Sequence, residues 1–302
     1  MVMESSTGVK SAIIFPGQGS QSTDMMSVYG SHSAVADAVS EASEAIGEDL
    51  SSIIADEKLI NMTVNTQPAL LAVSVGVFRA AKLPPPSMMA GHSLGEYTAL
   101  VCGGALEFGE AVCLSRRRGL LMQQSATGGM AAIIGELSAI EEQCESARKA
   151  GGKIWAANYN SPQQTVVAGD AAAIESCREW TKAAGIKRVV PLPVSIPSHS
   201  PLMQEAADTF MSDLQNIKWR TPNPPVIHNA TLQTANADEI PQVLAAQLVR
   251  PVRWAETISV FMESGITQIY ECGPGGVLTG LAKRITDAPP HSSLSNDAAL
   301  SS

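Results

Sequence analysis

The sequence has few aromatic, charged and cysteine side chains. Aromatic residues make up 4% and charged residues 16% of its 302 positions, and none of the five cysteines belongs to a CxxC pair. A disulfide framework needs an even set of cysteines and a zinc site needs closely spaced ones, so this pattern argues against both. The cysteines are better explained as small core residues.

Long hydrophobic runs and basic clusters are missing as well. No apolar stretch approaches the roughly 18 to 20 residues of a membrane span, and the N-terminal residues lack a signal-peptide pattern, which predicts a cytoplasmic protein with no membrane partner. Lys and Arg number 20 against 29 Asp and Glu, a net charge of -9, so nucleic acid is not an expected partner. An acidic protein partner would need a local basic patch.

Apolar residues make up 45% of the chain, enough for a sizeable core. Two short runs, 11–15 and 87–90, are predicted to be buried strands, and 226–229 and 268–272 are further strand candidates. The first leads into the glycine-rich loop 16–21, and the second ends in Gly91-His92-Ser93-Leu94-Gly95 before a helical segment over 96–102. Strand, glycine turn and helix are therefore expected in direct succession.

Between residues 130 and 193 the predicted order changes to strand, helix, strand, strand, helix, strand. The strands are expected over 130–134, 154–160, 164–168 and 188–192. Ser138 with Glu141 indicates a capping box for the first helix, and Asp170 can cap the second. This is the split βαβ order of a ferredoxin-like unit.

We therefore predict an α/β protein with an inserted domain. An α/β-hydrolase-like large domain with a parallel sheet should span 11–128 and 197–290, and a ferredoxin-like small domain should span 129–196. Residues 291–302, which are rich in Ser, Asn and Asp, should form a flexible tail.

The segment Gly91-x-Ser93-x-Gly95 fits a nucleophile elbow, in which a strand turns sharply into a helix and presents a serine. Glycine suits so tight a backbone because a Cβ would crowd it. A serine hydroxyl needs a base, usually histidine. His92 adjoins the nucleophile and should point elsewhere, which leaves His199 and His228 open; the hinge-like loop around His199 favours that residue.

Six motifs then match one known family in order and spacing. They are Phe15-Pro-Gly-Gln-Gly-Ser-Gln21, Thr66-Gln-Pro-Ala-Leu70, Gly91-His-Ser-Leu-Gly-Glu-Tyr97, Asn158-Tyr-Asn-Ser-Pro162, Pro197-Ser-His199 and Glu271-Cys-Gly-Pro-Gly275. From about residue 12 to residue 285, the chain resembles the malonyl-CoA:acyl carrier protein transacylases of type II fatty acid synthesis, part of the wider acyltransferase family. The Ser-His pair of the fifth motif selects His199.

The resemblance implies a role for each matching residue. Ser93 would be the nucleophile and His199 the base, oriented by the backbone carbonyl of Gln247, which fixes the tautomer without adding a charge. The backbone N–H groups of Gln18 and Leu94 would form the oxyanion hole. Gln67 and Asn160 would belong to the acyl pocket.

A malonyl group carries a free carboxylate, which calls for a cation with two parallel donors. Arg116, Arg117 and Arg118 follow one another on a predicted helix. Arg118 shares a stripe with Leu114 and Leu121, whereas its two neighbours turn away from it. A buried arginine is costly unless it is paired, and the family's Arg-Gly match also selects Arg118.

The predicted reaction is ping-pong transfer of malonyl from malonyl-CoA through Ser93 to the phosphopantetheine thiol of acyl carrier protein, with no metal or other cofactor. We expect a monomer. The acidic carrier should dock on basic residues near the cleft: Lys187, Arg188, Arg250, Arg253, Lys283 and Arg284.

Three alternative functions stay open. The first is a serine esterase, which would normally have an Asp or Glu between the nucleophile and the final His. The others are a non-catalytic carrier-binding domain and a neighbouring acyltransferase of polyketide synthesis or malonate decarboxylation.

Overall fold

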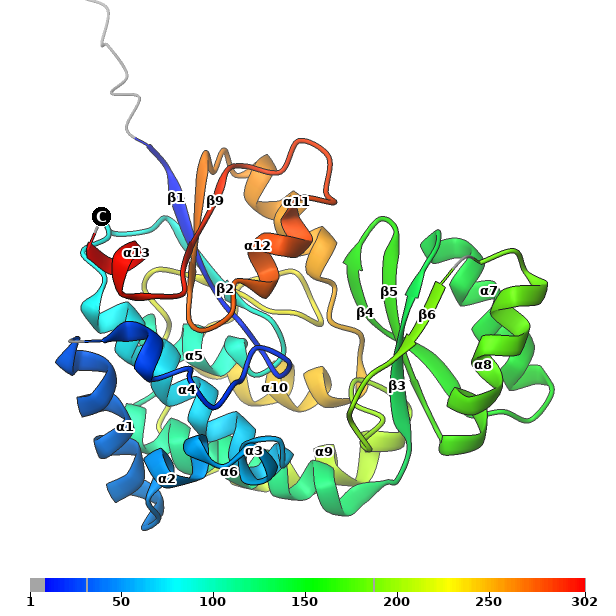
Figure 1. Cartoon of the computed structure of the whole chain (residues 1–302), viewed down its shortest axis with the longest axis horizontal. Coiled ribbons are helices and arrows are strands. Elements are labelled where there is room, and N and C mark those ends of the chain that lie inside the picture. The colour runs from blue at the N-terminus through cyan, green and yellow to red at the C-terminus, as the bar shows by residue number, and fades with distance from the viewer. Residues whose placement is uncertain (1–8, 31, 187, 302) are drawn as a thin grey trace, which may run out of the picture.

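The computed structural model describes residues 9–30, 32–186 and 188–301. Figure 1 shows a larger body and a smaller one side by side, the latter formed by the middle of the chain. The larger body contains a five-stranded parallel sheet and the smaller one a separate four-stranded antiparallel sheet, so the predicted fold class is confirmed. Within the described ranges, each helix is too short or too polar to span a lipid bilayer.

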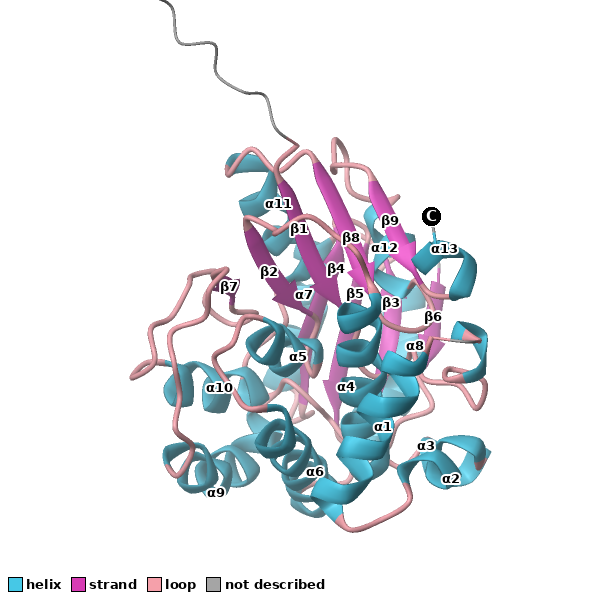
Figure 2. Cartoon of the chain, turned by 90° about the vertical axis from the view of Figure 1, so that its left-hand side faces the viewer, coloured by secondary structure: helices cyan, strands magenta, loops and turns pink. Residues whose placement is uncertain are grey.

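The parallel sheet has the order β7-β2-β1-β8-β9, and Figure 2 shows β2, β1, β8 and β9 side by side. Its strands are β1 (Ser11–Phe15), β2 (Met88–Gly91), β7 (Val226–Ile227), β8 (Gln268–Cys272) and β9 (His291–Leu294). In β1, Ile13 and Phe15 belong to one buried cluster and Ala12 and Ile14 to another. Both faces of the strand are therefore covered, which explains its uninterrupted apolar sequence.

Helices cover the two faces of this sheet unequally. The Ile13 face packs against the larger set, α1 (Ser33–Ile46), α2 (Leu50–Ala55), α4 (Thr63–Ala80), α5 (Gly95–Cys102), α6 (Phe108–Ser125), α9 (Gln204–Gln215) and α10 (Ile240–Val249). The Ile14 face packs against α11 (Trp254–Glu263) and α12 (Val277–Ala282). Short α3 (Glu57–Ile60) and the 3-10 turns η1 (Ser27–Tyr29) and η2 (Pro201–Met203) connect these elements.

The smaller body is a ferredoxin-like unit. Its elements are β3 (Gly129–Ile134), α7 (Leu137–Lys149), β4 (Ile154–Ser161), β5 (Gln164–Gly169), α8 (Ala171–Ala183) and β6 (Arg188–Pro191), with sheet order β4-β5-β3-β6. Asp170 caps α8 as predicted, accepting a hydrogen bond from the backbone N–H of Ala173 at 2.8 Å. The predicted capping box of Ser138 and Glu141 is wrong. Helix α7 begins at Leu137 with Glu136 as its N-cap, so Ser138 already lies inside the helix.

Two sets of backbone hydrogen bonds join the bodies. The N–H of Val252 donates to the carbonyl of Ala157 at 2.8 Å, and the N–H of Tyr159 donates back to Val252 at 2.9 Å, so β4 is bonded to a segment of the larger body. The two connecting segments are bonded to each other, from the Gly128 N–H to the Ser195 carbonyl at 3.0 Å. The small domain is thus attached along β4 and through a paired linker.

The tail predicted over 291–302 is ordered as far as the structure describes it. Residues 291–294 form β9, which pairs in parallel with β8, and α13 (Asp297–Ser301) follows. Leu294 is buried, and His32 pairs with Asp297 at 3.0 Å. The open edge of β8 provides backbone partners, which even a polar segment can use.

Candidate active site

Ser93 sits at a sharp turn between β2 and α5, with a left-handed φ of 53°. The flanking glycines permit this turn. A Cβ on Gly91 would lie 1.8 Å from the carbonyl carbon of Gly95, and one on Gly95 would lie 2.1 Å from the carbonyl oxygen of Phe15. Both distances are far inside van der Waals contact, so only glycine fits at either position.

The Ser93 hydroxyl and the His199 ring are in hydrogen-bond contact, with 2.7 Å between Oγ and Nε2. Nδ1 of the same ring bonds to the backbone carbonyl of Gln247 at 2.8 Å, so Nδ1 carries the proton and Nε2 accepts from the serine. Burial, reinforced by the charge of Arg118, lowers the pKa of His199 from 6.5 to about 3. The imidazole is therefore neutral at neutral pH and suited to accept a proton.

The second histidine left open by the sequence, His228, lies elsewhere. Its Nδ1 bonds to the Glu96 carboxylate at 2.7 Å, and its side chain is fully buried. The geometry therefore brings His199, and not His228, to the serine.

Arg118 lies on the inner face of α6 and is 1% exposed. Its Nη1 donates to Gln67 at 2.9 Å, and its Nη2 donates to the Gln247 side chain at 2.9 Å and lies 3.3 Å from Ser93 Oγ. Its neighbours in sequence pair with carboxylates nearer the surface, Arg116 with Glu48 and Arg117 with Asp213. The predicted orientation of the three arginines is confirmed.

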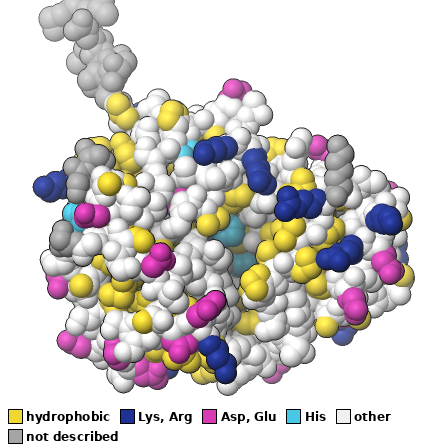
Figure 3. Space-filling view, in the orientation of Figure 1, with side chains coloured by type: hydrophobic (Ala, Val, Ile, Leu, Met, Phe, Trp, Pro, Cys, Tyr) yellow, Lys and Arg dark blue, Asp and Glu magenta, His cyan; other side chains and the backbone are white. Residues whose placement is uncertain are grey.

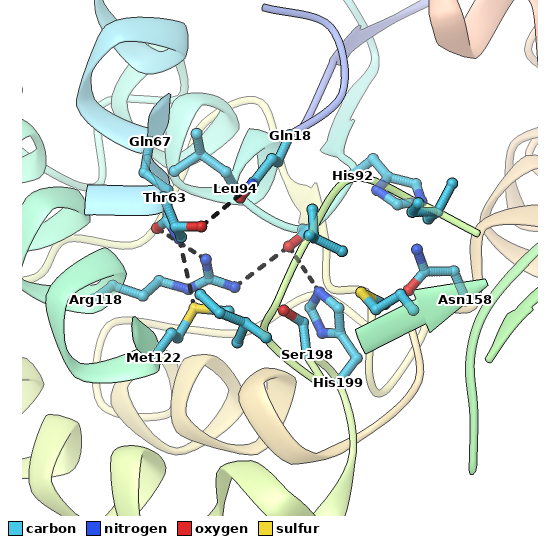
Figure 4. Close-up of a pocket in the computed structure, with 15 residues that line it drawn as sticks. Gln18, Thr63, Gln67, His92, Leu94, Arg118, Met122, Asn158, Ser198 and His199 are labelled. Atoms are coloured by element: carbon cyan, nitrogen blue, oxygen red, sulfur yellow. Dashed lines mark hydrogen bonds between the residues drawn. The ribbon is translucent and has the colours of Figure 1, made fainter. Parts of the chain in front are cut away.

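Figure 4 shows Arg118 and His199 in one pocket, and the dashed lines from both end at Oγ of Ser93. The polar part of the pocket lining comes from the large domain, except for Asn158 on β4. Of the apolar lining, Leu94 and Met122 belong to the large domain, and the small domain with its linker contributes Met130, Leu192, Val194 and Ile196. The arrangement can hold a short acyl group that has an anionic end, with its carbonyl close to Ser93.

Gln18 and Leu94 both line this pocket beside Ser93. Among the described residues, neither backbone N–H donates to a protein acceptor. A Cβ on Gly17 would lie 2.3 Å from the carbonyl oxygen of His92, so glycine lets the 16–21 loop approach the elbow closely. The two N–H groups stay predicted oxyanion donors.

His92 was expected to point away from the site, but it lines the pocket. Its Nε2 bonds to Oδ1 of Asn160 at 3.0 Å, and its ring packs on Trp254 with 5.5 Å between centroids. This hydrogen bond holds the His92 ring in place, and it links the large domain to the small one. Asn160 itself is not among the pocket-lining residues, whereas Asn158 is.

Sequence reasoning missed two polar residues under the elbow. Asn229 accepts from the Ser93 N–H at 2.7 Å and donates to the Gly91 carbonyl at 2.7 Å. Glu96 is fully buried in the first turn of α5. A carboxylate in the otherwise uncharged segment 95–102 was the available signal. No group of three or more His, Cys, Asp or Glu that could hold a metal occurs in the described part of the chain.

A family model described as acyl transferase domain matches residues 12–293. The chain belongs to the acyl transferase family. One member of the family, the malonyl CoA-acyl carrier protein transacylase of Escherichia coli (strain K12), is 43% identical over 302 residues, covering 96% of this chain and 97% of that protein. The Bacillus subtilis (strain 168) protein of the same name is 40% identical over 287 residues, covering 91% and 90%.

Solved structures of the acyl transferase family are also similar. The malonyl CoA-acyl carrier protein transacylase of Coxiella burnetii superimposes with a TM-score of 0.93 at 42% identity, covering 97% of this chain and 96% of that one. A malonyl-transacylase in complex with its type II PKS acyl-carrier protein gives 0.92 at 41% identity, covering 96% and 97%. The family resemblance predicted from the six motifs is confirmed.

Proposed function

We propose that this chain transfers a malonyl group from malonyl-CoA to the phosphopantetheine thiol of holo acyl carrier protein through a malonyl ester on Ser93. The observation that carries the proposal is the buried Arg118 guanidinium, 3.3 Å from the nucleophile oxygen. A cation at this place favours an acyl group with a free carboxylate. The names of the relatives, malonyl CoA-acyl carrier protein transacylases, agree with that chemistry.

In the first half-reaction, His199 takes the proton of the Ser93 hydroxyl as Oγ attacks the thioester carbonyl. The resulting oxyanion would be met by the N–H groups of Gln18 and Leu94. When the C–S bond breaks, the imidazolium returns the proton to coenzyme A. The carrier thiol then gives its proton to His199 and attacks the ester, and Ser93 leaves with that proton. No atom changes its oxidation state, so the reaction needs no redox cofactor, and we propose that it proceeds without a metal.

Carrier docking is proposed on the face that bears the cleft. Figure 3 shows Lys and Arg side chains in a band across this face, from the large to the small domain, whereas Asp and Glu gather on its lower left. Arg188, Arg250, Lys283 and Arg284 are exposed and have no carboxylate partner among the described residues. Arg253 bonds to Glu256, so it is the weakest of the predicted set; Lys187 lies outside the described residues.

The experiment compares two acceptors. With malonyl-CoA and purified holo carrier, malonyl-carrier should form faster than free malonate, and mass spectrometry of the intermediate should find malonate on Ser93 but none in Ser93→Ala. Faster release of malonate to water would instead identify a serine esterase. The esterase is disfavoured because His199 is oriented by a neutral carbonyl and not by a carboxylate.

A second candidate differs only in the pathway. One relative was solved with a type II PKS acyl-carrier protein, so a polyketide carrier is a plausible acceptor beside that of fatty acid synthesis, which we favour. Transfer rates to the two classes of carrier, measured side by side, decide between them. A cytoplasmic monomer remains our expectation, and light scattering of the purified chain tests the oligomeric state.

A further inference from the structure

Glu96 is the buried charge that the proposed reaction does not use. It is fully buried and accepts three hydrogen bonds, from Nδ1 of His228 at 2.7 Å, the backbone N–H of Asn229 at 2.9 Å and Nε2 of Gln247 at 2.8 Å. A buried carboxylate is held only where such donors surround it. None of the three donors belongs to Lys or Arg, and Glu96 does not line the pocket.

The Gln247 side chain links this carboxylate to the arginine. Its Nε2 faces two groups that only accept hydrogen bonds, the carbonyl of Ser93 at 3.0 Å and the Glu96 carboxylate. Its Oε1 must therefore face Nη2 of Arg118, 2.9 Å away. A rotated amide would set its oxygen against two acceptors and its NH₂ against a guanidinium, so Glu96 fixes which end of the amide meets Arg118.

Arg118 is held by these hydrogen bonds and by the ring of Tyr97, whose centroid lies 5.4 Å from the guanidinium carbon. Its bonding partners are the neutral side-chain oxygens of Gln67, Gln247 and Ser93, and no carboxylate among the described residues bonds to it directly. Glu96 is separated from it by a single amide. The same carboxylate anchors the backbone of Asn229, whose side chain bonds to both sides of the elbow.

We propose that Glu96 is a positioning residue that orients Gln247 toward Arg118 and thereby sets the selectivity for a carboxylated acyl group. The inference rests on the proposed function, and in it Glu96 and the Gln247 side chain act on the acyl group only through Arg118. It separates two roles of Gln247: its backbone carbonyl serves His199, and its side chain serves Arg118.

The test is the ratio of Ser93 acylation by malonyl-CoA to that by acetyl-CoA. In Glu96→Ala we expect this ratio to fall by about tenfold or more, because Arg118 loses a fixed partner that matters only to the carboxylate. In Glu96→Gln the new amide oxygen still accepts from Asn229 and Gln247, and its NH₂ can face His228, whose Nε2 has no partner in the described structure. This variant should keep the wild-type ratio.

Glu271→Ala is the matched control. Glu271 is equally buried, but it accepts from the backbone N–H groups of Leu278 and Thr279 at the start of α12. Its loss should lower the melting temperature and leave the ratio unchanged. If Glu96→Ala lowers both acylation rates equally, Glu96 is only structural and the proposal is overturned.

Gln247→Met keeps the test valid if Glu96→Ala does not fold. It retains the backbone carbonyl for His199 and removes Oε1, so the ratio should fall as in Glu96→Ala; an unchanged ratio overturns the proposal.

The double variant Glu96→Ala with Gln247→Met tests whether the two residues act along one path. If they do, its malonyl-to-acetyl ratio should fall no further than in the single variants. A wild-type chain that fails to move malonyl to the carrier would refute the proposed function itself, whereas an active wild type with unaffected variants refutes only the positioning role.

Discussion

In the large domain, the polar side chains of the site are held by buried hydrogen bonds between helices and the elbow, whereas the small domain adds mainly an apolar wall and one bond, from His92 to Asn160. Ser93, Arg118 and Gln247 therefore keep their mutual geometry through contacts within one domain. The difference suggests that the large domain determines whether acyl transfer occurs and the small domain adjusts which acyl group fits. Each prediction below challenges that division.

Replacing Arg118 by Met should have the largest effect. Removing one partner of a buried charge pair costs about 2–5 kcal/mol, so acylation by malonyl-CoA should fall by about 30- to 5,000-fold, whereas acetyl-CoA should lose much less. The measurement is kcat/KM for both donors. Arg117→Met, which removes a partly exposed ion pair with Asp213, is the control. Equal losses for the two donors would remove the carboxylate-binding role of Arg118.

The pH dependence of acylation tests the electrostatics of the large domain. A histidine with the ordinary pKa of 6.5 would be mostly protonated at pH 5 and lose about 30-fold in rate, but the pKa of His199 is lowered to about 3. We therefore expect kcat/KM to fall less than about twofold between pH 7 and pH 5. In Arg118→Met the profile should shift to higher pH, because one cause of the lowering is removed.

Stability has to be followed in the same experiment. Between pH 6.5 and about 3, His199 is protonated in the unfolded chain but not in the folded one. Its contribution therefore lowers the free energy of unfolding as the pH falls through that window. Circular dichroism at pH 5 separates unfolding from a true loss of rate. An apparent pKa near 6.5 in a folded protein would mean that His199 is more hydrated than its burial implies.

Reversing one charge on the cleft face should have a smaller effect that is confined to the carrier. Arg284→Glu should raise the KM for acyl carrier protein by about tenfold at low salt and less at high salt, because steering by exposed charges is screened. The rate of the first half-reaction should not change. Lys218→Glu, an exposed change of the same size in the segment after α9, is the control, and equal effects of the two would place docking elsewhere.

The smallest effect is expected in the small domain. Asn160→Ala removes the bond to His92 and should lower malonyl transfer about two- to fivefold, the value of one hydrogen bond. Acetyl and malonyl donors should be affected alike, because Arg118 is untouched. A loss as large as that of Arg118→Met would break the division between the domains.

The sequence predicted the parts of the fold that are dictated by local pattern. The uninterrupted apolar run of β1 and the strand-helix order from 129 to 191 required no knowledge of distant contacts. Strand β9 could not be predicted from Ser292 and Ser293, because its partner is the edge of β8 and its burial begins only at Leu294. The start of α7 was missed because a Ser-x-x-Glu pattern also occurs within a helix.

The site was predictable where a residue's own neighbours reveal its role. Arg118 stood out through its helical stripe, and Ser93 through its flanking glycines. The position of His199 in a hinge-like loop favoured it over His228, but only the family resemblance decided between them, since burial and partners are not visible in spacing. Glu96 and Asn229 escaped because their importance lies in bonds that join positions more than 130 residues apart.

The bonds between β4 and Val252 determine how the two bodies can move. A strand held at both its N–H and its carbonyl side cannot slide away from its neighbour without breaking the ladder. A rotation of the small domain about β4 would keep these bonds, within the limit set by the paired linker, and would displace β6 at the opposite edge of the small sheet. Leu192, which follows β6 and lines the pocket, would move with that edge. Such a rotation would change the width of the entrance, whereas the distance from Ser93 to Arg118 is set within the large domain.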